Sequence, residues 1–399
     1  MTIDGILETI LFLTALIIAY HHFGYPILLR RLARRRRSKC MPVPDFEASA
    51  LDLDELPSIT VIVPAHNEAR YIARKIKNLA ALSYPPHRLK IVIAFDGCTD
   101  DTKQLAERAL ADSAISAQVT LVDFAVNIGK IAVLNSCVSA AITDLVALSD
   151  TSAQVSDDAL LRAAAHFMEA SVGVVCGTYM LQSPLNEGER AYWRYQVEIK
   201  AGEAALAAPM GAHGAFYLFR RQTWTPLAPD TINDDFIIPM RIVAAGYRAV
   251  YDEHIVATEL EQTTVPQEFR RRARIGAGNL QQSLRLVELM DPRRGWLAFL
   301  FLSGKGLRPF IPFLGLTALA ATVGLAVRGH GLARAFLITT LPIVIAALSL
   351  PRWMLAVLPS PLAWLRYFTE GHAASLVGAL QYLAGRSAGA PHGAKSRPR

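Results

Sequence analysis

The sequence predicts an α/β protein in which a doubly wound domain is flanked by transmembrane helices. Short β-branched runs alternate with helical patterns between residues 56 and 260, an order that builds a mainly parallel sheet. Apolar stretches about long enough to span a bilayer lie on both sides of that region. Hydrophobic residues make up 52% of the 399 residues and charged residues only 19%, a composition that excludes a disordered chain.

The first apolar stretch, Thr9 to Leu29, is followed by a strongly basic flank. Residues 30–39 contain seven cations and no acid, whereas Asp4 and Glu8 precede the stretch. A cleavable signal peptide has the opposite arrangement, so residues 1–40 are predicted to be an uncleaved anchor with the arginines in the cytosol. This flank carries +7 and the basic tail, residues 386–399, carries +4, so the rest of the chain has a net charge of −4 within the total of +7. That placement indicates membrane orientation, and no nucleic-acid partner is expected.

A second apolar region covers residues 296–385. Pro309–Val327 and Ala335–Leu350, extended to Leu358, are predicted crossings joined by the loop Arg328–Arg334. Residues 361–384 carry charged side chains, and they either cross the membrane or lie in its interface as an amphipathic helix. The positive-inside rule favours the interface, because a further crossing would place the basic tail outside.

Between these regions, five β-branched runs predict strands and four helical patterns separate them. The predicted strands are 58–63, 90–95, 118–124, 144–150 and 172–180, and the predicted helices are 68–82, 100–112, 129–140 and 156–169. Ligands of such sheets bind beyond the carboxyl ends of the strands. The residues that directly follow each strand are therefore the candidates for chemistry.

Polar residues follow the first four predicted strands: Asn67 and Glu68, then Asp96, Lys130 and Asp150. Each alone is compatible with an ordinary helix N-cap. Together at one sheet edge, the acids, the amide and the lysine suit a nucleotide diphosphate with a divalent ion. No GxGxxG follows the first strand and no GxxxxGK[ST] occurs, which argues against a dinucleotide oxidoreductase and a P-loop NTPase.

Along essentially its whole length, the chain resembles the membrane-bound family 2 glycosyltransferases with a GT-A fold, a group that includes cellulose, chitin and hyaluronan synthases and bacterial exopolysaccharide enzymes. VIVPAHNEA resembles the family's opening strand motif, FDGCTDDT its second motif and NIGKIAVLN its GK…LN segment. The resemblance implies that a nucleotide sugar is bound by Pro64, Ala65, Asn67, Glu68, Asp96, Lys130 and Asp150.

The segment from Ser149 to Ser152 stands where this family has its metal-binding D-x-D or D-x-N. The resemblance implies that Asp150 binds a divalent cation, Mg²⁺ or Mn²⁺. Ser152 occupies the position of the usual second ligand, so metal coordination is expected to be weaker than the family pattern promises.

Residues 232–236, INDDF, resemble the family's TED or EDxxL motif at the start of a helix that runs to Gly246, before the strand YRAVYD. The match makes Asp235 the catalytic base, with Asp234 in place of the neighbouring Glu. Two adjacent acids at a helix start can have pKa values pushed apart, so that one accepts a proton. The alternative for the pair is ordinary capping near the positive end of the helix.

Residues 268–275 fall where the family has Q-x-x-R-W. Arg274 matches the arginine, but Arg271 replaces Gln and Ile275 replaces Trp, which puts processive chain growth in doubt. The resemblance assigns Arg271, Arg272 and Arg274 to the diphosphate or acceptor, together with His213 of the segment 211–215. Guanidinium groups suit phosphate oxygens. The alternative is a basic face of an amphipathic helix on anionic lipid, which describes Arg270 and Arg271 better than Arg274.

The resemblance thus implies a membrane-bound inverting glycosyltransferase that moves a hexosyl unit from a nucleotide sugar, expected to be UDP-linked, to a saccharide acceptor in cell-surface polysaccharide synthesis. The alternative is a single transfer to a membrane lipid. The expected location is the cell (inner) membrane, multi-pass, with the catalytic domain of residues 56–260 in the cytosol. The parts around it are the anchor 1–40, an interface helix in 261–295, the membrane segments 296–385 and the tail 386–399.

Overall fold

The computed structural model describes residues 2–37, 52–183, 187–261, 265–350 and 360–385. These residues fall into two compact units. The sheet unit contains the described residues between 32 and 262 together with 294–297, and the helical unit contains those in 1–31, 263–293 and 298–388.

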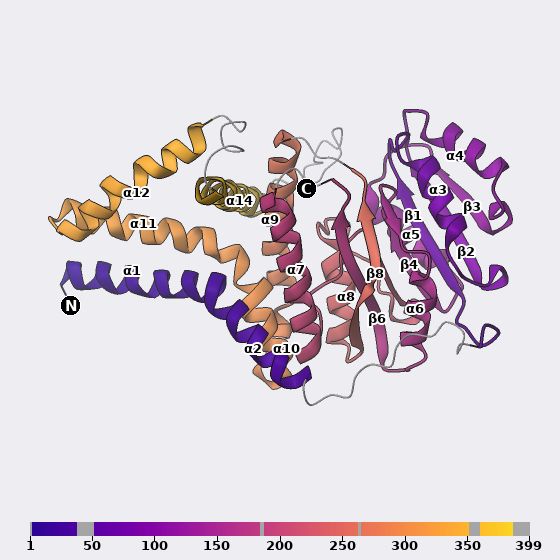
Figure 1. Cartoon of the computed structure of the whole chain (residues 1–399), viewed down its shortest axis with the longest axis horizontal. Helices are drawn as coiled ribbons and strands as arrows, with labels where there is room; N and C mark the ends of the chain where they lie inside the picture. Colours follow the sequence, from indigo (N-terminus) through magenta and orange to yellow (C-terminus); the bar gives the residue numbers. More distant parts are fainter. Residues whose placement is uncertain (1, 38–51, 184–186, 262–264, 351–359, 386–399) are drawn as a thin grey trace. The chain divides into compact units, whose positions relative to one another are not determined.

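The sheet unit is built on an eight-stranded sheet in the order β3-β2-β1-β4-β7-β6-β8-β5 (Figure 1). Its strands are β1 (Ile59–Ala65), β2 (Leu89–Asp96), β3 (Val119–Phe124), β4 (Leu145–Ser149), β5 (Ala153–Val155), β6 (Val172–Leu181), β7 (Phe216–Arg220) and β8 (Arg248–Glu259). Its helices are α3 (Ile72–Ala81), α4 (Thr102–Ala111), α5 (Lys130–Ala140), α6 (Ala159–Phe167), α7 (Glu187–Leu206) and α8 (Asp234–Ala244). All five strands and all four helices predicted from the sequence of this region are confirmed, with ends shifted by a few residues.

The sheet is mixed but mainly parallel, as predicted: four of the seven strand pairings among the described residues are parallel, including that of β6 with β8. β1 pairs in parallel with β2 and β4, and β2 with β3, as the alternation predicts. β7 is antiparallel to β4 and β6, and β5 is antiparallel to β8. The reversal of β7 follows from its entry point: Phe216 pairs with Ser149, so β7 begins where β4 ends and runs back along it.

The centre of the sheet is buried on both faces. Ile59, Val61, Ile62 and Val63 of β1 are all 0% exposed, which explains why this strand reads as a continuous apolar run instead of an alternating one. Helices α3 and α4 pack against each other, and α5 packs on β1 and β2. The sheet edge at the carboxyl ends of β1, β2 and β4 is thereby held rigidly.

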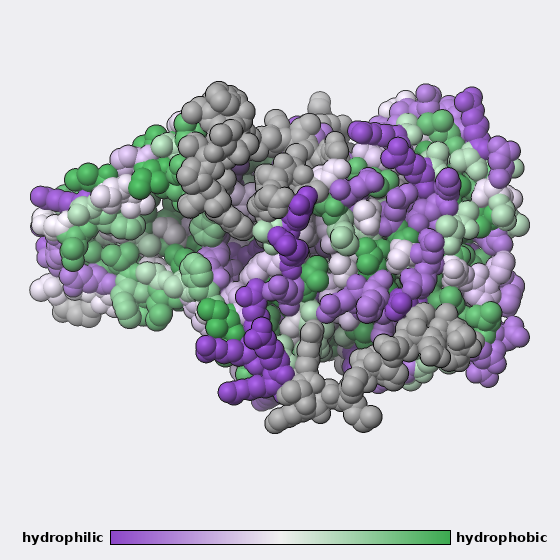
Figure 2. Space-filling view, viewed as in Figure 1, coloured by the Kyte–Doolittle hydropathy of each residue, from purple (hydrophilic) through white to green (hydrophobic). Residues whose placement is uncertain are grey.

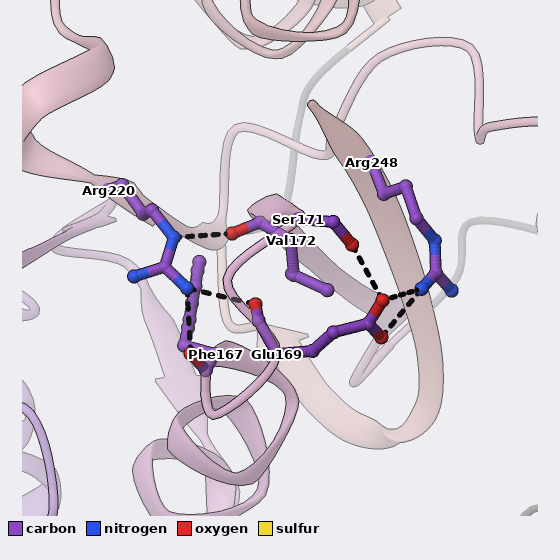
Figure 3. Close-up of polar contacts among 6 residues, drawn as sticks. All are labelled: Phe167, Glu169, Ser171, Val172, Arg220 and Arg248. Atoms are coloured by element: carbon purple, nitrogen blue, oxygen red, sulfur yellow. Dashed lines mark hydrogen bonds and ion pairs between the residues drawn. The ribbon is translucent and has the colours of Figure 1, made fainter. Parts of the chain in front are cut away.

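Far from that edge, a polar network joins the beginnings of β6 and β8 to the end of β7 (Figure 3). Arg220 donates hydrogen bonds of 2.7 Å to the carbonyl oxygens of Val172 and Phe167, and one of 2.9 Å to that of Glu169. The Glu169 carboxylate in turn accepts from Ser171 and Arg248, both at 2.6 Å. The network has no residue in common with the predicted site, and its role is to hold these strand ends together.

The helical unit consists mainly of long helices. They are α1 (Ile3–Ala19), α9 (Val265–Arg285), α11 (Ile311–Val327), α12 (Gly331–Ser349) and α14 (Ser360–Leu383), while α2 (Tyr25–Arg37) and α10 (Trp296–Leu300) each contribute residues to both units. Three continuous helical stretches in the described residues are long and apolar enough to cross a bilayer: Ile3–Arg36, Trp296–Val327 and Gly331–Ser349. α1 packs along α11, and α11 packs on α12 (Figure 1). Apolar side chains cover the outside of these helices (Figure 2), and Phe12, Leu332 and Ile338 are 66%, 90% and 73% exposed.

The predicted loop Arg328–Arg334 is shorter than expected, because α12 already begins at Gly331. The predicted extension of this crossing to Leu358 lies outside the described residues. Residues 361–384 form one helix, α14, which packs closely on α9. A Cβ added at Gly378 would lie 1.8 Å from the carbonyl oxygen of Ala273, and one added at Gly276 would lie 2.6 Å from Cα of Ser375. Only glycine permits so close an approach of two helix backbones.

Candidate functional site

The loop after β1 is tied to both neighbouring strands. Pro64 and Ala65 are the last two residues of β1, and the Thr151 hydroxyl donates to the Pro64 carbonyl at 3.0 Å. Asn67 has φ +55°, a left-handed conformation that asparagine adopts more readily than most residues. Its Oδ1 accepts a hydrogen bond of 2.8 Å from the backbone N–H of Thr99. The loops after β1, β2 and β4 are therefore held as one surface.

Glu68 lies in this surface among other carboxylates. Its pKa is raised to about 7, mainly by burial and then by the nearby negative charges of Glu261, Asp150, Glu259 and Asp100. Glu259 and Glu261 are not among the site residues predicted from the sequence, because the last predicted strand ends near Asp252. The structure extends β8 to Glu259, whose pKa is also raised by burial and which pairs with Ala153 beside Asp150.

Asp96 is buried, and the backbone N–H groups of the next loop use both of its oxygens. Ile128 donates to Oδ1 at 2.6 Å and Gly129 donates to Oδ2 at 3.0 Å. The following Gly97 has φ +59°, and a Cβ there would lie 2.2 Å from the backbone nitrogen of Asn127. Asp96 and Gly97 therefore fix the backbone that leads into Lys130. The predicted contact of Asp96 with the nucleotide base stays a prediction.

Lys130 joins acids from two other elements. It is the first residue of α5, and its Nζ lies 3.2 Å from Oδ1 of Asp150 and 3.4 Å from Oδ2 of Asp234. Burial disfavours the charged ammonium, but Asp150, Asp234 and Asp235 outweigh that effect and raise the pKa of Lys130. Asp150 lies in the turn between β4 and β5, and Asp234 begins α8. Three segments far apart in sequence thus meet at one permanently positive group.

The two adjacent acids of α8 have different surroundings. Asp234 is 6% exposed, and its Oδ2 accepts no hydrogen bond within the described part of the chain. Asp235 is half-buried, and its Oδ2 lies 3.4 Å from the point that a Cβ on Gly214 would occupy. Oδ2 of Asp150 lies 3.6 Å from the same point, so both carboxylates lie close to Gly214. Asp235 is thus the more accessible acid of the pair.

Lys75 is fully buried behind this site, and the sequence analysis missed it. Its Nζ donates hydrogen bonds of 2.6 Å to Oγ of Ser149 and to the carbonyl of Ala153. Burial lowers the pKa of Lys75 to about 7, against the opposing effect of Asp150 and Glu259. The helical pattern indicates its burial: Lys75 lies on the same face of α3 as the apolar residues Ile72, Ile76 and Leu79.

His213 stands next to Gly214 and belongs to a ring cluster. Its imidazole stacks on Tyr179 at 3.7 Å between ring centroids and an interplanar angle of 10°. Trp193 of α7 contacts both rings, at 4.5 Å from Tyr179 and 5.1 Å from His213. This ring cluster belongs to the sheet unit and lies beside Gly214, close to the carboxylates of Asp150 and Asp235.

The three predicted arginines lie on α9, in the helical unit. Arg272 donates a hydrogen bond of 2.7 Å to Glu268, and its guanidinium lies 4.0 Å above the ring of Tyr367 on α14. Arg271 lies 3.7 Å from the same carboxylate. These contacts give Arg272 a structural part in joining α9 to α14. The assignment of the three arginines, Arg274 among them, to the diphosphate or acceptor stays a prediction.

The site carries carboxylate oxygens, the donor type that a hard divalent cation takes, but in the described residues they are not gathered as a ligand set. Asp150, Asp234 and Asp235 supply carboxylate oxygens, and Oδ2 of Asp234 has no hydrogen-bond donor in the described part of the chain. Nζ of Lys130 forms an ion pair with Asp150. Among the described residues, no three His, Cys, Asp or Glu side chains lie close enough together to serve as a set of metal ligands. Ser152 is buried at 7% exposure. A cation would therefore have to draw Asp150 partly away from Lys130.

Comparison with known proteins gives a consistent result. Residues 60–230 match the model of the glycosyl transferase family 2. The chain is 25% identical over 243 residues to poly-beta-1,6-N-acetyl-D-glucosamine synthase of Staphylococcus aureus, covering 59% of this chain and 58% of that protein. It is 27% identical over 272 residues to beta-monoglucosyldiacylglycerol synthase of Nostoc sp., covering 62% and 55%.

The matched region thus spans under two thirds of the length of either curated relative. Among solved structures, the mannosyltransferase PcManGT from Pyrobaculum calidifontis, in complex with GDP-Man and Mn²⁺, superimposes with a TM-score of 0.71. The match covers 95% of this chain and 99% of that one at 24% sequence identity, a likeness that establishes the fold.

Proposed function

Because this chain is a glycosyltransferase with a family 2 domain and a GT-A fold, we propose that it transfers a hexosyl unit from a UDP-linked sugar to a saccharide acceptor with inversion. The enzyme acts on nucleotide sugars; the particular donor, the acceptor and the stereochemistry belong to the proposal. The observation that carries it is the meeting of Lys130 with Asp150 and Asp234, with Asp235 alongside at Gly214.

Asp235 is the proposed catalytic base. It would take the proton from the acceptor hydroxyl while that oxygen attacks the anomeric carbon and the bond to the diphosphate breaks. Its half-buried position beside Gly214 supports this role, since an acceptor needs room to approach. Asp234 is less suited to it, because it is buried and faces Lys130 at 3.4 Å. A single base opposite the leaving group implies inversion.

Lys130 is the proposed partner of the departing diphosphate. Three carboxylates keep it protonated, so it offers a fixed positive charge where negative charge develops. A divalent cation held by Asp150 would add Lewis-acid stabilisation of the same leaving group. Asp96 supports Lys130 from behind by holding the backbone of Ile128 and Gly129. His213, Arg271, Arg272 and Arg274 are assigned to the acceptor or diphosphate by the family resemblance alone.

We place the enzyme in the cell (inner) membrane as a multi-pass protein with the sheet unit in the cytosol. The three apolar helical stretches support insertion into a bilayer. The run of arginines that begins at Arg30 lies at the carboxyl end of the first of them, which favours the cytosol for that end.

A second candidate is a single transfer to a membrane lipid. Two observations favour it: the likeness to a glucosyldiacylglycerol synthase, and Ile275 in place of the family's Trp. The mass of the product distinguishes the candidates, because a glycolipid carrying one sugar differs from a growing polysaccharide.

The test uses the full chain, purified in detergent and offered a panel of UDP-sugars with Mg²⁺ or Mn²⁺, with UDP release and product mass as readouts. Asp235→Asn should abolish transfer, a loss of about 10²-fold or more for a general base, and leave nucleotide binding nearly intact. Asp112→Asn, an exposed acid at the end of α4, is the matched control and should behave as wild type. Activity of Asp235→Asn near that of wild type would show that the base is another residue.

A further inference from the structure

The loop 207–215, which joins α7 to β7, follows the first turn of α8 closely. The backbone N–H of Ala212 donates a hydrogen bond of 2.8 Å to the carbonyl oxygen of Asp235. Gly211 has φ +79°, and a Cβ there would lie 2.5 Å from Cδ2 of Phe236. Its backbone nitrogen lies 3.3 Å from Sδ of Met240. Because only glycine permits this approach, the loop is fitted to the backbone that carries Asp235.

Two charged side chains of α7 bind the same loop. Nζ of Lys200 donates a hydrogen bond of 2.6 Å to the carbonyl oxygen of Gly211 and lies 3.4 Å from that of Ala212. Oε2 of Glu203 accepts a hydrogen bond of 2.9 Å from the backbone N–H of Met210. Glu203 is 2% exposed, and Lys200 is half-buried. Hydrogen bonds to charged groups are about twice as strong as neutral ones, so α7 fixes three consecutive residues of the loop.

A single peptide group connects Lys200 to Asp235. The carbonyl of Gly211 and the N–H of Ala212 belong to the same planar, trans peptide unit, so its oxygen and its hydrogen point in opposite directions. The oxygen accepts from Lys200 at 2.6 Å, and the N–H donates to the Asp235 carbonyl at 2.8 Å. Hydrogen bonds linked in this way polarise and strengthen one another. Since α7 packs on β6 and β8, the connection is anchored to the sheet.

We propose that Lys200 is a positioning residue, which acts through the Gly211–Ala212 peptide to hold Asp235, the base of the proposed function, in place. Lys200 needs no contact with the sugar donor or the acceptor for this role. Lys130 and Asp150, which are assigned to the diphosphate and the cation, are held by Asp96 and by Lys75 instead. A base displaced by about 1 Å can cost about 10²-fold in rate. Loss of Lys200 should therefore slow the chemical step and leave donor binding intact.

The test uses the full chain in detergent and the UDP-sugar that wild type uses fastest, with kcat expressed per UDP-binding site so that misfolded protein is not counted. Lys200→Met removes the ammonium at similar volume. Its kcat should fall about tenfold, while the KM for the UDP-sugar and the Kd for UDP change by less than about twofold. Lys200→Arg keeps donors for the same carbonyls and should recover most of the lost kcat. Arg194→Met, which removes an exposed cation from the same helix, is the matched control and should behave as wild type.

A wild-type kcat for Lys200→Met overturns the positioning role, and so does a loss of UDP binding as large as the loss of kcat, because the whole site would then be damaged. Equal kcat values for Lys200→Arg and Lys200→Met also overturn it, since the donated hydrogen bond would not matter. Asp235→Asn, assayed alongside, separates this role from the proposed function. If Asp235→Asn is inactive and Lys200→Met behaves as wild type, the positioning role alone fails. If Asp235→Asn keeps wild-type activity, the base assignment fails, and the positioning role fails with it.

Discussion

The buried ammonium of Lys75 donates a hydrogen bond of 2.6 Å to the hydroxyl of Ser149, the residue directly before Asp150. A second bond of 2.6 Å reaches the Ala153 carbonyl on the far side of the same turn. The backbone N–H of Asp150 donates to Ala215 at 3.1 Å, so the turn is also held from β7. The position of Asp150 thus depends on a lysine that lies behind it.

Lys75→Met should weaken use of the sugar nucleotide. Methionine fills a similar volume, but the carbonyl of Ala153 loses its donor, and a buried unsatisfied group costs about 1–3 kcal/mol. Removal of a buried charge offsets part of that cost. We expect the KM for the donor to rise about tenfold, as 1.4 kcal/mol would give. Lys77→Met, an exposed lysine on the same helix, is the control, and equal KM values for the two variants would contradict the role of Lys75.

Divalent cations should be required, and Asp150 should set that requirement. Chelation with EDTA should stop transfer, and added Mn²⁺ or Mg²⁺ should restore it. Asp150→Ala should lose both nucleotide binding and the response to added metal, because it removes the carboxylate assigned to the cation. Asp123→Ala, which removes an exposed acid paired with Lys103, serves for comparison. An unchanged metal titration curve for Asp150→Ala would place the cation elsewhere.

Glu68 should make the folded state less stable as the pH rises from about 4.5 to about 7. Its pKa is raised from 4.5 to about 7, mainly by burial and then by neighbouring acids. Between those values the folded protein retains a proton that the unfolded chain has released, so stability falls with rising pH and levels off above about 7. Unfolding temperatures of wild type and Glu68→Gln from pH 5 to pH 8 measure this, as the variant should lack this part of the decline. Parallel curves would mean that Glu68 ionises normally.

Gly378→Ala should destabilise the helical unit. The added methyl would lie 1.8 Å from the carbonyl oxygen of Ala273, so α9 and α14 must separate. Overpacking of this kind typically costs about 1–3 kcal/mol, and a clash with backbone belongs at the upper end. Gly315→Ala in α11 is the matched change, because its methyl meets nothing within 4 Å. Thermal unfolding in detergent should separate the two; equal unfolding temperatures would contradict the close contact.

The sequence was most informative where the chain repeats a local pattern. The β-branched runs predict β1, β2, β3, β4 and β6 because each is an uninterrupted run of five or more residues, and all but the edge strand β3 are largely buried. β5 has only three residues, too few for a periodic signal. β8 was cut short because Asp252, Glu253 and His254 interrupt its apolar pattern beside a register shift.

For the site, sequence reasoning selected Lys130, Asp150, Asp234 and Asp235, and the structure brings these residues together. It could not find Lys75 or Glu259, because their importance arises from burial against segments distant in sequence. The sequence also does not show that the Asp96 carboxylate accepts hydrogen bonds from the backbone of the next loop. An acid that binds a nucleotide and an acid that holds a loop would both stand directly after a strand. The roles of all these residues in transfer stay predictions.

The two hydrogen bonds that Asp96 accepts from the backbone affect how an acid at this position is interpreted in related sequences. An acid that shapes a loop is replaceable only by a side chain of the same length and oxygen geometry, so selection would preserve it as strictly as an acid that touches the donor. A strict match at this position therefore carries no information about which sugar nucleotide a relative uses. Differences in substrate preference should instead be sought around Gly214, where any larger side chain would meet the carboxylates of Asp150 and Asp235.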